Sequence, residues 1–475
     1  MQRLSTLKFF MKQKNKTYLL ITITLMAAFL IPSLVQEGMF VDGVTYSAIS
    51  KNLANGIGSN WNPHYTKTLY PEFREHPPLV FIIQSLFFRI FGDAFYTERI
   101  FCFIVALLTA LGIVNIWKLM NDNKEISNDY WLPIFLWLLV PLVAWSYKNN
   151  MLENVMGLFT IFAVCFLIKA IKEGYNLYLI AGGIFILFAF LSKGFTGLFP
   201  IVVPLIFAFV FKTGKKAILS FILLAVFLLI TSLSLLYLFP GIRSNISMYL
   251  DQQVIAALSN HREVTTGNRF TIILNMILEL IVPLAIVIIL FISAKIKSRT
   301  NLPFRNKNFL FFLLIALSAS VPLIISLKQR KYYLIPSIPF YALAFSSLMH
   351  QNISELLGRV PAKVHFWIRR ISYSLLTLIF IFSIMKFGKF SRDQEKLQDV
   401  YTITGFVPEG TIISTTKELW SDWGLVAYMS RAGYLSLDCD HQHEFFLNTK
   451  ESSEAPPEGY HLVNIKLAKY QLYKK

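Results

Sequence analysis

Apolar residues come in long runs along most of the chain, and short polar segments separate these runs. Most runs approach the ~20 residues that an α-helix needs to cross a bilayer. The pattern therefore predicts an all-α polytopic membrane protein with about eleven transmembrane helices. The predicted spans lie near residues 18–35, 96–118, 129–146, 152–171, 177–191, 196–211, 217–239, 270–293, 308–327, 332–349 and 371–388.

Two further segments depart from this pattern near the start of the chain. The apolar run Leu79 to Phe91 is too short to cross a bilayer, so we interpret it as a helix lying at the membrane interface. The first span follows a basic tail and resembles a signal peptide. It has no small-residue cleavage site, which favours an uncleaved anchor.

The hydrophobic pattern changes after residue 390. Short β-like runs at 411–415, 434–437 and 460–465 alternate there with turn signals, which predicts a small α/β domain over residues 391–475. We therefore divide the chain into a basic tail (1–17), a transmembrane module (18–390) and this C-terminal domain. Two long loops, 36–95 and 241–269, leave the transmembrane module on the side opposite the tail.

Composition agrees with a membrane protein, because 55% of the residues are hydrophobic and 15% are charged. A soluble domain carries about 25% charged residues, so an ordinary cytosolic protein is excluded. A net charge of +18 would suggest nucleic acid as the partner of a soluble protein. Here Lys and Arg concentrate on alternate loops, as the positive-inside rule requires, and we predict membrane lipids and no nucleic acid as partners.

The same charge bias predicts the orientation of the chain. It predicts a protein of the plasma (inner) membrane with its N-terminus in the cytoplasm. An odd number of spans then predicts that the C-terminal domain lies outside the cytoplasm. Acidic residues gather on the outer segments, where we therefore expect the chemistry. They are Glu37, Asp42, Glu72, Glu75, Asp93, Glu98, Glu153, Asp251 and Glu263.

Several cations lie on this outer side against the positive-inside trend. Lys148, Lys193, Arg330 and Lys331 each adjoin a predicted span, where a phosphate group would lie. Lys193 is the strongest candidate, because it belongs to a glycine-containing break (SKGFTG, 192–197) between two short apolar runs, and such a break directs backbone N–H groups toward an anion. The alternatives are a simple turn and contacts to lipid headgroups.

Three carboxylates are expected at the same membrane boundary. Asp42 follows the first span, with Tyr46 one helical turn later in a position to support it. Glu75 and His76 precede a Pro-Pro pair, and Glu153 begins the fourth span. Charged groups at this level are costly unless they are hydrated or paired, so a shared polar cavity is a reasonable inference. The alternative for each is a solvated loop acid.

Four local patterns together resemble one family of proteins. They are an Asp followed by a Tyr after the first span, EHPPL at 75–79, SKGFTGLFP at 192–200 and KYYLIPSIP at 331–339. In this order they resemble the polytopic glycosyltransferases of the GT-C fold. The closest resemblance is to the protein-mannosyltransferase-like branch that includes the aminoarabinose transferases acting on lipid A.

The resemblance implies roles for individual residues. Asp42 matches the essential acid of the family, and Glu153 matches its second outer acid. Lys193, Arg330, Lys331 and His76 are implied to bind the phosphate of the donor. Further candidates for the substrate cavity are Tyr46, Glu75, Lys148, Tyr332 and Tyr333.

The resemblance also implies the cofactor requirement. No cofactor is required, and a divalent metal held by Glu75 and His261 is the alternative. Gly43, His76 and Glu153 differ from the usual residues of the family. The resemblance therefore implies the class of reaction and leaves the exact sugar and acceptor open.

The function implied is transfer of a sugar from a polyprenyl-phosphate donor to a lipid or glycan acceptor on the non-cytoplasmic face, with inversion. A glycolipid similar to lipid A or lipopolysaccharide is the favoured acceptor. A transporter or flippase of lipid-linked sugars is one alternative, although its polar residues would be expected near the midplane. A protein O-mannosyltransferase and a ligase or polymerase of surface polysaccharide are the others.

Overall fold

The computed structural model of the protein describes residues 2–174, 176–255, 268–296, 306–452 and 454–475. Eight helical segments in this part are long and apolar enough to cross a membrane. They contain α1 (Gln2–Leu34), α4 (Thr97–Met120), α8 (Leu152–Glu173), α9 (Asn176–Lys193), α11 (Lys215–Leu238), α16 (Lys307–Ser320) with η4 (Val321–Ile325), η5 (Lys331–Ser337) with α17 (Ile338–Gly358), and α18 (Ala362–Met385).

Two predicted spans are bent rather than straight. The first comprises α5 (Lys124–Ser127), α6 (Trp131–Leu138) and α7 (Pro141–Lys148), with a bend of 78°, and the second comprises α14 (Thr271–Glu279) and α15 (Ile281–Ile296), with a bend of 62°. Pro141 begins α7 and explains the first bend, because proline is tolerated in the first turn of a helix but interrupts a continuing one.

Counting each bent pair as one span raises the number to ten in the described part of the chain. The sequence predicts about eleven, and the additional one is the apolar run at 196–211. This run is shorter than the other candidates and is divided between the 3₁₀ helix η1 (Phe195–Val202) and α10 (Val203–Phe211).

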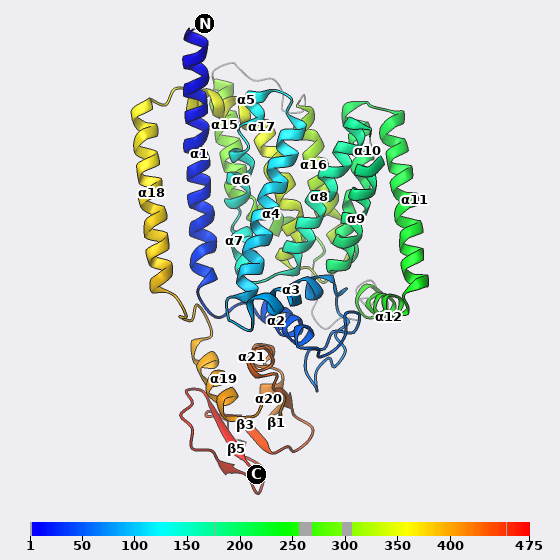
Figure 1. Ribbon diagram of the computed structural model, residues 1–475, viewed down its shortest axis with the longest axis vertical. Coiled ribbons are helices and arrows are strands. Elements are labelled where there is room, and N and C mark those ends of the chain that lie inside the picture. The colour runs from blue at the N-terminus through cyan, green and yellow to red at the C-terminus, as the bar shows by residue number, and fades with distance from the viewer. Residues whose placement is uncertain (1, 175, 256–267, 297–305, 453) are drawn as a thin grey trace.

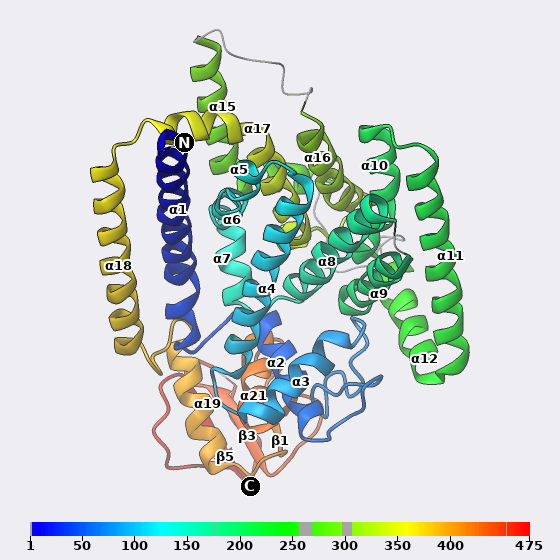
Figure 2. The same ribbon diagram turned by 45° about the horizontal axis from the view of Figure 1, so that its top comes forward.

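The helices differ strongly in burial. Within the candidate spans of α8 and α17, 78% of the residues are buried by the rest of the protein, against 11% for α11 and α18. α8 and α17 therefore form the centre of the bundle. Figures 1 and 2 show α11 and α18 on opposite flanks, where their apolar side chains are exposed as expected for a surface that faces lipid.

Short helices cover one end of the bundle. α2 (Val41–Ala54), α3 (Leu79–Phe91) and α12 (Pro240–Tyr249), which continues into the π-helical turn η2 (Leu250–Ile255), lie at the end opposite the N-terminus (Figure 1). α3 lies across this end of the bundle, in agreement with the interfacial helix expected from its length. The described helices of both long loops therefore share one face of the molecule.

The C-terminal domain lies beyond these helices, at the same end (Figure 1). Its strands form one mixed sheet in the order β2-β1-β3-β5-β4, in which β1 is parallel to β2 and β3 while β5 is antiparallel to β3 and β4. The strands are β1 (Ile412–Thr415), β2 (Ser436–Asp438), β3 (Phe445–Thr449), β4 (His461–Leu462) and β5 (Tyr470–Lys474); the helices are α19 (Gln394–Phe406), α20 (Lys417–Trp420) and α21 (Trp423–Gly433).

The predicted fold class is confirmed: the protein is a polytopic all-α membrane bundle with a small α/β unit at its C-terminus. Three of the five strands overlap the runs predicted from the sequence. β3 and β5 are additional strands, and β3 is almost wholly buried, so it lacks the alternation of apolar and polar residues that identifies a half-exposed strand.

Candidate active site

The candidate site begins at α2, whose first turn carries Asp42. The helix packs very closely against the turn between α7 and α8. A Cβ atom added at Gly43 would lie 2.0 Å from the carbonyl oxygen of Asn149, so this position requires glycine. The departure of Gly43 from the family pattern thus has a structural reason in this chain.

Two asparagines fix this contact through hydrogen bonds. The Asn149 side chain accepts a bond from the backbone N–H of Phe40 at 2.7 Å. Asn150, with a positive φ of 50°, donates to the Gly43 carbonyl at 3.1 Å and to Ser47 at 3.0 Å. The sequence analysis missed these two positioning residues. Their position just before Glu153 was the available signal.

Asp42 itself contacts Tyr332, which lies in η5. The Tyr332 hydroxyl donates a hydrogen bond to Asp42 Oδ2 at 3.2 Å, and its ring stacks on Trp145 at 6.0 Å between centroids. Tyr46, which we expected to support Asp42, instead makes its side-chain hydrogen bond with His76, with 3.4 Å between Oη and Nε2.

Lys193 ends α9 and pairs with Glu153, which lies in the first turn of α8. The pair is almost completely buried, with 8% of the Lys193 side chain and 0% of the Glu153 side chain exposed. The Lys193 ammonium also faces the rings of Tyr332 and Tyr333, at 5.5 and 5.2 Å from their centroids. The predicted break after Lys193 is present, and Gly194 adopts a positive φ of 87° there.

These contacts join four predicted residues into one cluster. Asp42, Tyr332, Lys193 and Glu153 come from α2, η5, α9 and α8, and each contacts the next in this order. We call them the central cluster. It combines a half-exposed carboxylate with a buried ion pair, which are the elements needed for proton transfer and for binding an anion.

The other predicted residues lie outside the central cluster. Arg330 precedes η5, Lys331 begins it, both are exposed, and Lys331 pairs with Glu279 at 3.4 Å. Glu75 accepts a hydrogen bond from Tyr70 at 3.4 Å. Lys148 lies elsewhere, with its backbone carbonyl bonded to Arg99, and none of its described contacts joins it to the cluster.

The alternative metal site is not supported by the described residues. His261 lies outside them, so the proposed pairing with Glu75 has no described geometry. Within the described part of the chain, no group of three His, Cys, Asp or Glu side chains is arranged to hold a metal ion.

An apolar groove of about 410 Å³ is lined in part by residues close to Lys193 in the sequence. Its walls come from α9, η1, α11 and α12, and they include Phe190, Leu191 and Phe195, which flank Lys193 in the sequence. Almost all of the lining is hydrocarbon, so this groove suits an apolar chain rather than a polar ligand.

Comparison with known proteins supports this description of the fold. Residues 75–237 match the family model described as dolichyl-phosphate-mannose-protein mannosyltransferase. This range includes the EHPPL and SKGFTGLFP motifs. No curated protein sequence matches the chain.

Solved structures extend the similarity to nearly the whole chain. ArnT from Cupriavidus metallidurans bound to undecaprenyl phosphate has a TM-score of 0.65 at 13% identity, covering 96% of this chain and 97% of that one. Its apo state gives a TM-score of 0.63 at 14% identity with the same coverage.

An archaeal oligosaccharyltransferase, AglB from Archaeoglobus fulgidus in complex with an inhibitory peptide and a dolichol-phosphate, gives a TM-score of 0.50 at 13% identity, covering 89% of this chain and 64% of that one. The resemblance drawn from the sequence is confirmed: the chain is a multi-pass membrane protein with the GT-C fold of these transferases.

Proposed function

We propose that the protein transfers a sugar from a polyprenyl-phosphate donor to a lipid or glycan acceptor on the non-cytoplasmic face, with inversion at the anomeric carbon. The central cluster is the observation that carries this proposal. It contains a carboxylate on α2, a helix at the end of the bundle opposite the N-terminus (Figure 1), and a cation in the same cluster, whereas a transporter is expected to carry such groups near the midplane.

The donor phosphate is assigned to Lys193, Arg330 and Lys331, with His76 as a further candidate. A departing phosphate needs positive charge. Lys193 faces the rings of Tyr332 and Tyr333, and Arg330 and Lys331 directly precede these tyrosines in the chain. The apolar groove lined by Phe190, Leu191 and Phe195 then accommodates the prenyl chain. ArnT and AglB support this assignment, because their structures contain undecaprenyl phosphate and a dolichol-phosphate.

The two carboxylates take different roles in this proposal. Glu153 is buried against Lys193, so we assign it to holding the ammonium in place. Asp42 is partly exposed and accepts one hydrogen bond from Tyr332. It accepts the proton of an acceptor hydroxyl as the C–O bond to the donor phosphate breaks. If the acceptor is a phosphate, Asp42 orients it instead.

The favoured acceptor is a glycolipid similar to lipid A, as the resemblance to the aminoarabinose transferases implies. Mass spectrometry of lipids and surface glycans from cells with and without the gene tests this directly. A missing mass increment identifies the sugar and the acceptor together. An unchanged set of lipids and glycans would contradict the proposal.

The variant Asp42→Asn tests the mechanism. It keeps the shape of the side chain and removes its charge and most of its basicity, so we expect loss of transfer with donor binding largely intact. Product formation and donor binding are measured on the same purified protein in detergent. Asp440→Asn, an exposed acid in the C-terminal domain, is the matched control. Transfer at the normal rate by Asp42→Asn would show that the base lies elsewhere.

A further inference from the structure

Both ends of α2 contact one helix of the C-terminal domain, α21. At the start of α2, the Tyr428 hydroxyl accepts a hydrogen bond from the backbone N–H of Met39 at 3.2 Å and lies 3.1 Å from the Met39 carbonyl oxygen. The same hydroxyl is 3.1 Å from Asp393 Oδ2. Tyr428 therefore binds the backbone three residues before Asp42.

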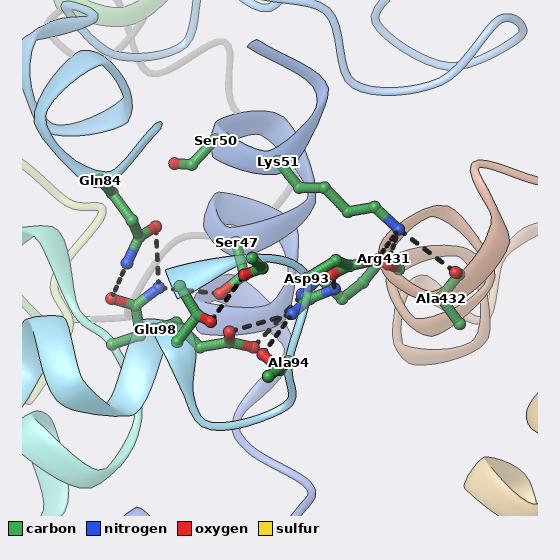
Figure 3. A network of polar contacts seen from close by, with 12 residues as sticks. Ser47, Ser50, Lys51, Gln84, Asp93, Ala94, Glu98, Arg431 and Ala432 are labelled. Atoms are coloured by element: carbon green, nitrogen blue, oxygen red, sulfur yellow. Dashed lines mark hydrogen bonds and ion pairs between the residues drawn. The ribbon is translucent and has the colours of Figure 1, made fainter. Parts of the chain in front are cut away.

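At the other end of α2, Lys51 binds the last turn of α21. Its ammonium donates to the carbonyl oxygens of Arg431 at 3.0 Å and Ala432 at 3.2 Å, and it pairs with Asp93 at 2.6 Å. Figure 3 shows Lys51 reaching across to this turn. The position suits a cation, because the C-terminal end of a helix carries partial negative charge.

Arg431 ties the same turn of α21 to the connection between α3 and α4. Its guanidinium pairs with Asp93, and it donates to Glu98 Oε2 at 3.1 Å and to the Ala94 carbonyl at 3.1 Å (Figure 3). Only 12% of the Arg431 side chain is exposed. Arg431 binds Glu98 through two nitrogens, at 3.3 and 3.1 Å, and this bidentate, buried pair holds the last turn of α21 against the start of α4.

The membrane bundle also holds α2, through Asn150, which binds Gly43 and Ser47 as described above. The helix is thus held by two parts of the protein: the membrane bundle contacts its first turns, and the C-terminal domain contacts both of its ends. A catalytic base displaced by about 1 Å can lose on the order of 10²-fold in rate, so these contacts bear directly on Asp42.

We propose that α21 sets the position of Asp42, with Tyr428 as the positioning residue. The proposal gives the C-terminal domain a role in turnover, and its kinetic consequence rests on the proposed function. The described contacts of the Tyr428 hydroxyl are to Met39 and Asp393, outside the central cluster. Tyr428 acts through the backbone of Met39 and the first turn of α2.

The test compares Tyr428→Phe with Tyr460→Phe. Both variants remove one hydroxyl and keep the ring, but the Tyr460 hydroxyl donates to the His443 carbonyl inside the C-terminal domain. For Tyr428→Phe we expect kcat to fall by about tenfold, with the donor KM unchanged within about twofold, because geometry at the base is lost and donor binding is not. Tyr460→Phe should retain both values.

Hydrogen exchange provides a second readout that needs no activity. The amides of residues 44–47 hydrogen-bond within α2, beginning with Val44 N to Phe40 O at 3.2 Å. They should exchange faster in Tyr428→Phe than in the wild type, and Tyr460→Phe should leave them unchanged. If hydrogen exchange and kcat in Tyr428→Phe match those of the control variant, the positioning role of α21 is overturned. If exchange is faster in Tyr428→Phe but the wild type transfers no sugar, the proposed function is refuted and the positioning role of α21 is supported.

Discussion

Two clusters of buried charge lie at the same end of the molecule, and their surroundings differ. The first cluster joins α21 of the C-terminal domain to the rest of the protein; we call it the seam, and it consists of Lys51, Asp93, Glu98 and Arg431. In the seam, Arg431 donates to two carboxylates and a backbone carbonyl. In the central cluster, and within the described part of the chain, the Lys193 ammonium has one carboxylate partner, Glu153, and otherwise faces tyrosine rings. A lysine ammonium carries three donors, so Lys193 retains capacity that Arg431 has used.

The two clusters show that buried charges serve two purposes in this protein: some fix the structure, and others are available to bind a ligand. A charge whose donors all bind protein groups fixes the structure, as Arg431 does for α21. A cation such as Lys193, which is oriented by one buried carboxylate and otherwise faces aromatic rings, can bind a further anion without a large rearrangement. The seam is therefore expected to govern stability and position, while the central cluster governs transfer.

The largest expected effect comes from removing the cation of the central cluster. Lys193→Met keeps the length of the side chain, and transfer should fall by at least ~10²-fold, the scale of one lost electrostatic contact to a developing charge. The variant also leaves Glu153 buried without its cation. Breaking a buried pair in this way costs about 3–5 kcal/mol, so stability must be measured beside activity.

A double variant separates these two consequences. In Lys193→Met with Glu153→Leu, apolar side chains replace both charges, and such replacements are often neutral for stability. We expect the melting temperature in detergent to return close to that of the wild type while transfer stays low. Recovery of transfer in the double variant would show that the pair is structural and would remove the contrast with the seam.

A smaller effect is expected when the seam is perturbed at Asp93. Burial alone would raise the pKa of Asp93, but Arg431 and Lys51 outweigh this and hold its pKa below the ordinary value. A depressed pKa means that the carboxylate stabilises the folded state above its unfolded pKa of about 3.9, and that this contribution is lost as the pH falls through the lower folded pKa.

Asp93→Asn should therefore lower the free energy of unfolding by about 1 kcal/mol at pH 7, the scale of a half-exposed pair. The difference from the wild type should stay constant between about pH 5 and 8 and shrink below about pH 4. Thermal unfolding across this pH range is the measurement. Asp122→Asn, which removes an exposed partner of Lys172, is the control and should change little. A difference that disappears already at pH 6 would contradict the assigned pKa.

The sequence was sufficient to predict most of the fold, because membrane spans depend on local hydrophobicity and length. It also selected Asp42 and Lys193 as candidate site residues, since a charge beside a span requires a reason. The pairing of Lys193 with Glu153 was not predictable in the same way. It depends on how α8 and α9 pack together, and no local pattern encodes that geometry.

The seam was beyond reach for the same reason, in a stronger form. Arg431 and Asp93 are separated by 338 positions in the chain, and each looks like an ordinary surface charge in its own segment. The hydrogen bond from Tyr332 to Asp42 shows the same limit. Helical spacing pointed to Tyr46 as the support of Asp42, but the hydroxyl that donates to this carboxylate comes from η5.

The smallest effect on stability is expected at Lys331, the exposed cation of the site. It is 52% exposed and pairs with Glu279 at 3.4 Å, so Lys331→Met should change the free energy of unfolding by at most ~1 kcal/mol. If Lys331 contacts the donor phosphate, the donor KM should nevertheless rise by about tenfold, equivalent to ~1.4 kcal/mol of binding. Added salt should weaken donor binding less in this variant than in the wild type, because one exposed charge contact is already absent.

Lys386→Met is the matched control for this last prediction. Lys386 follows α18 and faces the Phe382 ring at 5.4 Å, so it is also a boundary lysine beside an aromatic ring, but on a flank of the bundle. Its removal should leave the donor KM unchanged. An unchanged KM in Lys331→Met as well would remove Lys331 from the phosphate site. Lys193 and Arg330 would then supply the positive charge that binds the donor phosphate. The phosphate site would in that case not extend to the exposed Lys331 at the start of η5.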